Sequence, residues 1–143
     1  YFKLKAPHPN LTTFDCPDAN KTFFHLQSSN KPLNALILLN NAVYTEAARS
    51  FAKTLLQTEK NLSDEERLNL AFLRCVSRPM NGTESNQFGS LLQASREWYK
   101  SHEEDAKKMT GGSGVEGTPM AESAAWTATC RMMLNMDEFI TRD

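Results

Sequence analysis

The apolar residues of this sequence recur every three or four positions over long stretches, which is the spacing of one face of an α-helix. The stretch NALILLNNAVYTEAARSFA, residues 34–52, shows this pattern first. Pro32 precedes it and suits the first turn of a helix, where its missing N–H costs nothing. The pattern predicts a helix from about residue 33 to Glu59. The buried face of this helix should carry Leu36, Val43, Ala47, Phe51 and Leu55, with the amide of Asn40 at its centre.

The same spacing predicts three further helices. Ser63 and Glu66 form a capping box at the start of the second helix. Thr83 is the expected N-cap of the third helix, and Pro119 opens the fourth after the glycine-rich loop 110–119. The residues expected to face the core are Leu68, Phe72, Cys75 and Val76 in the second helix, Phe88, Leu91, Leu92, Trp98 or Tyr99 and Met109 in the third, and Trp126, Cys130, Met133 and Ile140 in the fourth.

Residues 1–32 differ from the rest of the chain because they hold four of the six prolines and show no sustained periodicity. Proline favours extended backbone in the residue before it, so this segment is expected to be an extended arm. Phe14, Phe23 and Phe24 would allow the arm to pack against the body. A chain of 143 residues fits one domain. The sequence therefore predicts an all-α fold, in which a single domain over 1–143 forms a compact bundle of four main helices (33–143) with the arm packed on it.

Composition narrows the classes of partner. Sixteen Lys and Arg against seventeen Asp and Glu leave a net charge of −1, without the basic stripe of a nucleic-acid-binding protein. The longest uninterrupted apolar run is 35–39, far short of the ~20 residues that a membrane-spanning helix needs. The chain opens at Tyr1 with no signal-peptide pattern, so we expect a fragment or processed product whose targeting signal lies outside it.

Side chains that could perform catalysis are few and scattered. His8, His25 and His102 share no helical face, and His102 falls on the inner stripe of the third helix, where a histidine satisfied within the core is commoner than a metal ligand. Asp15 and Asp18 lie close in sequence, but two carboxylates are too few for a calcium site, and a turn-forming role is favoured. We therefore expect no catalytic centre.

The cysteines and methionines also favour a structural reading. Cys16, Cys75 and Cys130 form no CxxC or CxxCH motif, which argues against a zinc ribbon and against covalently bound haem. Cys75 and Cys130 lie among apolar residues and are expected to be buried thiols. The methionines near residue 133 recur at helical spacing and are expected to fill the core. We expect neither a cofactor nor a bound metal.

Three segments, in order along the chain, resemble one family of domains. They are FDCPDANKTFFHLQSSNKPLNALILLNN (residues 14–41), LNLAFLRCVSRP (68–79) and AAWTATCRMMLNMDEFITRD (124–143). These segments resemble the PSD-type domains of unknown function, which stand at the carboxyl end of large secreted proteins of Planctomycetes and related bacteria. The resemblance implies a periplasmic or secreted location. It also implies that the partners are other domains of the parent chain, including one that carries a c-type cytochrome.

The resembling segments contain all of the candidate binding residues. Asn40 and Asn135 stand at corresponding points, each closing a run of apolar residues on a predicted helix. A buried amide without a partner costs on the order of 1–3 kcal/mol, so we expect both amides to be bonded and Asn40 to bond the backbone of the arm. The candidate binding residues are Asp15, Asp18, Asn40, Arg78, Asn135, Asp137 and Glu138.

Two functions of different classes follow. The first is a non-catalytic helical module that packs against the cytochrome-bearing remainder of a secreted multidomain protein. The second is a ligand-binding or hydrolytic domain acting on extracellular polysaccharide, with Asp15, Asp18, Asp137 and Glu138 as candidate acids. The second function requires two carboxylates about 5–10 Å apart in a cleft.

Overall fold

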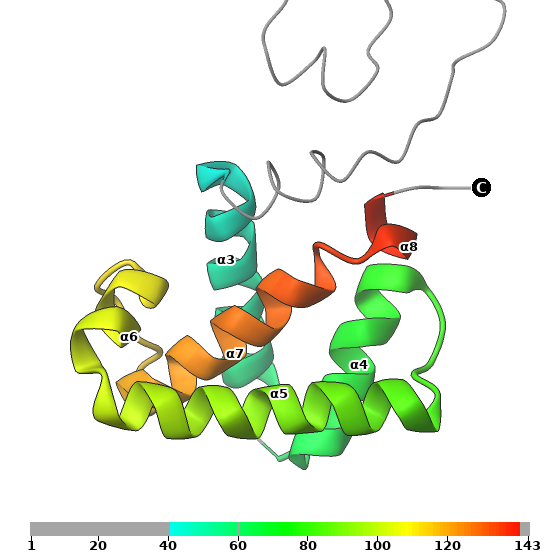
Figure 1. Ribbon diagram of the computed structural model, residues 1–143, viewed down its shortest axis with the longest axis horizontal. Helices are drawn as coiled ribbons and strands as arrows, with labels where there is room; N and C mark the ends of the chain where they lie inside the picture. The colour runs from blue at the N-terminus through cyan, green and yellow to red at the C-terminus, as the bar shows by residue number, and fades with distance from the viewer. Residues whose placement is uncertain (1–40, 60, 141–143) are drawn as a thin grey trace, which may run out of the picture.

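The computed structural model describes residues 41–59 and 61–140, which contain helices and no strand (Figure 1). The all-α fold predicted from the sequence is confirmed. None of the helices in these residues has both the length and the apolar character to cross a membrane. The expected arm over 1–32 lies outside the described residues. Within them the six helices, five of them substantial, are α3 (Ala42–Thr58), α4 (Asp64–Val76), α5 (Gly82–Ser101), α6 (Glu103–Thr110), α7 (Met120–Met133) and the short α8 (Asp137–Ile140).

Side-chain caps fix the starts of α4 and α5. The Ser63 hydroxyl accepts the N–H of Glu66 while the Glu66 carboxylate accepts the N–H of Ser63 at 2.8 Å, which confirms the predicted capping box. Asn81 and Glu84 form the same device on α5. The prediction of Thr83 as N-cap was therefore wrong by two residues, because an asparagine amide caps a helix as well as a hydroxyl does.

The start of α3 also differs from the prediction. Asn41 has an extended backbone, and its side-chain oxygen accepts the N–H of Val43 at 2.8 Å. Because this residue is the N-cap of α3, α3 begins at Ala42 and not at residue 33, and the part of the predicted helix before Asn41 lies outside the described residues.

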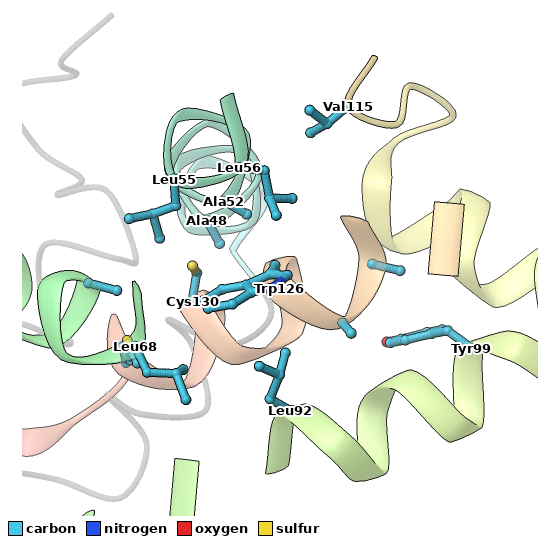
Figure 2. Packing of buried hydrophobic residues seen from close by; sticks show 14 of the residues in the cluster. Ala48, Ala52, Leu55, Leu56, Leu68, Leu92, Tyr99, Val115, Trp126 and Cys130 are labelled. Atoms are coloured by element: carbon cyan, nitrogen blue, oxygen red, sulfur yellow. The ribbon is translucent and has the colours of Figure 1, made fainter. Parts of the chain in front are cut away.

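Helix α7 crosses the middle of the molecule, and α3, α5 and α6 make their main contacts with it (Figure 1). A helix that is buried on all sides belongs to the core. Trp126 and Cys130 lie between Leu55 of α3 and Leu92 of α5 (Figure 2). Alanines and threonines on the other faces of α7 are short enough for the neighbouring helices to approach closely. The buried residues of α7 are Ser123, Ala124, Ala125, Trp126, Thr127, Thr129, Cys130 and Met133.

The buried face of α3 is rotated from the predicted one. Val43 is 73% exposed and Ala47 is exposed as well, so their assignment to the core was wrong. Phe51 is half-buried and Leu55 is fully buried, as expected. The face that packs on α7 consists of Ala48, Ala52, Leu55 and Leu56. Relative to the predicted stripe, the observed face takes Ala48 and Ala52 in place of Val43 and Ala47.

The predicted third helix is divided at His102 into α5 and α6. His102 leaves the helical conformation (φ −127°, ψ 67°), and its imidazole Nδ1 lies 2.8 Å from the carbonyl oxygen of Trp98, which would otherwise accept a backbone N–H. The imidazole also stacks on the Trp98 indole, with 3.8 Å between ring centroids. Trp98 is 55% exposed and Tyr99 is the buried residue of the pair. His102 is therefore a half-buried residue at the break between two helices, and the expectation of a core histidine was wrong.

The predicted fourth helix is also divided. Trp126, Cys130 and Met133 are buried as expected. Helix α7 ends at Met133, a tight turn follows, and Ile140 lies half-buried at the end of α8.

The expectation of buried thiols is confirmed for Cys130 and holds only in part for Cys75. Cys130 is fully buried and Cys75 is half-buried, and both are free. Burial raises the pKa of the Cys75 thiol to about 11 and also raises the pKa of the Cys130 thiol.

Leu55→Ala and Val43→Ala together test the rotated face of α3. Leu55→Ala should lower the free energy of unfolding by about 2–5 kcal/mol, because it leaves a cavity against α7. Val43→Ala should change it by less than about 0.5 kcal/mol, because the side chain is mostly in solvent. Urea unfolding followed by circular dichroism measures both, and comparable losses would contradict this packing.

Candidate interaction groove and the ion pairs beside it

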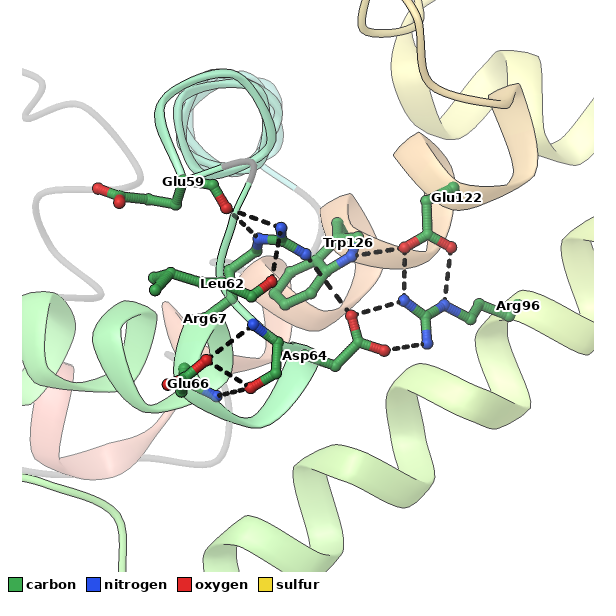
Figure 3. A network of polar contacts seen from close by, with 9 residues as sticks. Glu59, Leu62, Asp64, Glu66, Arg67, Arg96, Glu122 and Trp126 are labelled. Atoms are coloured by element: carbon green, nitrogen blue, oxygen red, sulfur yellow. Dashed lines mark hydrogen bonds and ion pairs between the residues drawn. The ribbon is translucent and has the colours of Figure 1, made fainter.

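The buried indole of Trp126 is the starting point of a chain of charged contacts (Figure 3). Its N–H donates to the carboxylate of Glu122 at 2.8 Å, one helical turn earlier on α7. Arg96 of α5 donates two hydrogen bonds to this carboxylate, of 2.7 and 2.5 Å. The same guanidinium donates two more to Asp64 at the start of α4, of 2.5 and 2.9 Å. Arg96 therefore joins α4, α5 and α7, and its hydrogen bond lowers the pKa of the Asp64 carboxyl.

Arg67 contacts both Asp64 and the ring of Trp126, so the chain of contacts closes on itself. The buried guanidinium lies 5.3 Å from the centre of the Trp126 ring and 3.5 Å from Asp64. It also donates to the backbone carbonyls of Glu59, at 2.8 Å, and Leu62, at 3.1 Å. Arg67 thereby satisfies the C-terminal end of α3 and the turn into α4.

Arg78, one of the predicted binding residues, forms a second two-carboxylate contact. Its guanidinium donates to Glu84 of α5 at 2.7 and 2.9 Å and to Glu138 of α8 at 2.7 and 2.8 Å. It also lies 5.0 Å from the centre of the Phe72 ring. The hydrogen bonds from Arg78 lower the pKa of Glu84 to about 2 and lower the pKa of Glu138. Arg78 therefore holds α8 and the start of α5 against the end of α4.

An open groove of about 660 Å³ runs along the outer side of α4 and α5, and one end of it reaches Arg96. Leu68 and Leu92 form its floor and are already buried. Nothing lies within 4 Å of the position where a Cβ on Gly89 would be. A glycine inside a helix costs about 1 kcal/mol relative to alanine, and no neighbour in this part of the structure requires its small size. The lining residues are Asp64, Glu65, Leu68, Ser85, Asn86, Gly89, Ser90, Leu92, Gln93 and Arg96.

A second, smaller cavity of about 180 Å³ lies between α3 and the glycine-rich loop. Arg49 at its edge donates to the carbonyls of Lys108 and Met109, both at 2.8 Å. These bonds satisfy the C-terminal end of α6, so the guanidinium of Arg49 already serves the fold. Within the described residues no group of three or more His, Cys, Asp or Glu is placed to hold a metal ion.

Of the predicted site residues that the structure describes, it brings Arg78 and Glu138 into contact. Asp137, beside Glu138, is exposed. The side-chain oxygen of Asn135 is buried without a hydrogen-bond partner in the described part of the chain, so the expectation that it is bonded was wrong for this oxygen. The candidates Asp15, Asp18 and Asn40 lie outside the described residues.

The groove residues were not predicted from the sequence. Arg96 and Glu122 are 26 positions apart and lie on different helices, so no local spacing links them. Gly89 gave one signal, because a glycine within an otherwise regular helical pattern costs about 1 kcal/mol relative to alanine.

These contacts define an all-helical domain whose helices are joined by arginines that each bridge two carboxylates. The chain belongs to the PSD1 family, described as a protein of unknown function (DUF1553), whose family profile matches residues 1–92. The match ends within α5, at Leu92 in the floor of the groove. No curated protein and no solved structure matches the chain significantly.

Arg96→Gln tests the bridge at Trp126. The variant should lose about 3 kcal/mol of unfolding free energy, because it leaves Asp64 and Glu122 half-buried without their common cation. Arg74→Gln is the matched control: Arg74 pairs with Glu59 at 3.0 Å but is 40% exposed, so its loss should stay below about 1 kcal/mol. Chemical denaturation measures both variants, and equal losses would contradict a special role for Arg96.

The Arg78 contact predicts a dependence of stability on acid pH. The pKa of Glu84 is about 2 against an ordinary value of 4.5, so this group stabilises the fold above about pH 4.5 and loses that contribution as the pH falls toward 2. Glu138 shifts in the same direction. The melting temperature of the wild type should fall across this window, and that of Arg78→Gln should fall less. The variant should retain the part of the slope that comes from Asp64. Identical slopes in the two proteins would rule out the Arg78 contact as the cause.

Proposed function

We propose that the chain is a non-catalytic helical interaction module that packs against the remainder of its parent protein. The groove between α4 and α5 is the observation that carries this proposal. It is larger than the cavity beside the glycine-rich loop, and it lies between helices that Arg78 and Arg96 hold in place. A preformed surface of this kind suits association without a large rearrangement.

The identity and location of the partner come from the resemblance found in the sequence. We propose that the module stands near the carboxyl end of a secreted or periplasmic bacterial protein and that its partner is the cytochrome-bearing remainder. Membership of the PSD1 family supports the first step, because the resemblance was to PSD-type domains.

The polysaccharide-hydrolase alternative is less well supported. A general acid in a glycosidase needs a raised pKa so that it is protonated at neutral pH. Glu138, one of the four candidate acids, has a lowered pKa because it is paired with Arg78. Nothing in the described geometry favours this carboxylate as a proton donor.

Association with the parent protein can be measured directly. The chain, with an affinity tag, is mixed with the separately produced remainder of its parent protein, and the tag is then placed on the remainder instead. Retention in both orientations, with competition by excess untagged chain, is the expected result. Absence of association in both orientations would refute the proposed function.

A further inference from the structure

The shape of the groove indicates what can enter it. The residues of α5 that line it include Ser85, Gly89, Gln93 and Arg96, which recur every three or four positions and so lie on one face. Eleven steps from Ser85 to Arg96 cover about 16 Å, or three helical turns. Because Leu68 and Leu92 already close the floor, the groove is long and shallow. Such a surface accepts the side of a helix more readily than a single inserted side chain.

Gly89 lies near the middle of this length. Its helical position costs stability, and the open space around its absent Cβ shows that no neighbouring residue in the described structure makes use of it. Glycine on a helix surface allows a second backbone to approach closely. The residue therefore marks the point of closest approach for an occupant that is not itself among the described residues.

The charged residues that line the groove are Asp64 and Glu65 on α4 and Arg96 on α5. Asp64 is paired with both Arg96 and Arg67. Glu65, the neighbouring residue on α4, also lines the groove, and none of the described residues forms an ion pair with it. The α4 wall therefore offers one carboxylate to an incoming cation.

We infer that the groove between α4 and α5 binds a helix of the remainder of the parent protein, which presents small residues to Gly89 and a lysine or arginine to Glu65. This inference rests on the proposed function and adds the site and the chemistry of the partner. A saccharide is the less suitable occupant because none of the described residues that line the groove carries an aromatic ring, the usual stacking surface for a sugar.

Two substitutions test the groove, each with a matched control. Gly89→Leu fills the point of closest approach, and it should fold because leucine has the better helix propensity and meets no neighbour. Gly82→Leu is its control, since Gly82 is also on α5, has equally open surroundings and does not line the groove. Glu65→Gln removes the unpaired charge. Glu103→Gln is its control, because both residues are acids in the first turn of a helix.

Titration calorimetry of each variant with the separately produced remainder of the parent protein gives the readout. Gly89→Leu and Glu65→Gln should each weaken binding by about tenfold or more, while both controls stay within about twofold of the wild type. Circular dichroism and melting temperature verify that all four variants are folded.

The other outcomes separate the two proposals. Binding by the wild type that Gly89→Leu leaves unchanged would overturn the groove inference and leave the proposed function intact. Failure of the wild type to bind would refute the proposed function and the inference with it. Chitohexaose that shifts amide resonances of residues 85–96, in a chain that does not bind the remainder, would identify a saccharide site instead.

Discussion

The indole N–H of Trp126 is buried in the middle of the molecule, and the way it is satisfied joins α4 and α5 to α7. An orphaned donor there would cost on the order of 1–3 kcal/mol. Glu122 supplies the acceptor, but a carboxylate at this depth requires a cation, which Arg96 provides from α5. Asp64 and Arg67 complete the set, so the two acids and two bases sum to zero charge. One buried N–H thus links α4, α5 and α7 through directional contacts that a purely apolar core would lack.

The groove is a consequence of how α4 is attached to α5. Its N-terminal end is joined to Arg96, and Arg78, just after its C-terminal end, is joined to Glu84 near the start of α5. Between these contacts the inner side is filled by Leu68, Leu92 and the edge-to-face pair of Phe72 and Phe88. The outer side carries the small and polar residues of α5 and remains open. Charged contacts at both ends therefore keep two helices together without requiring them to pack closely along their outer sides.

Sequence reasoning succeeded where the signal was local and failed where it was distant. The capping box of Ser63 and Glu66 spans three residues and could be read directly, and the buried positions Trp126, Cys130 and Met133 followed from helical spacing. Val43 was misplaced because helical spacing alone does not fix which face packs on α7, and the face that does so includes Ala48. The pairing of Arg78 with Glu138, 60 positions away, depends on the tertiary fold and has no sequence signature. The groove was missed for the same reason, because it exists only between two helices.

The central place of α7 has a consequence for the order in which the protein is made. The three helices that pack mainly on it, α3, α5 and α6, all precede it in the chain. Synthesis proceeds from the amino terminus, so these helices leave the ribosome before the surface that buries their apolar faces exists. The core closes only once Met133 has emerged. Until then the nascent chain exposes Leu55, Leu92 and Tyr99 to solvent, which makes the interval before α7 appears the period in which chaperones have most to protect.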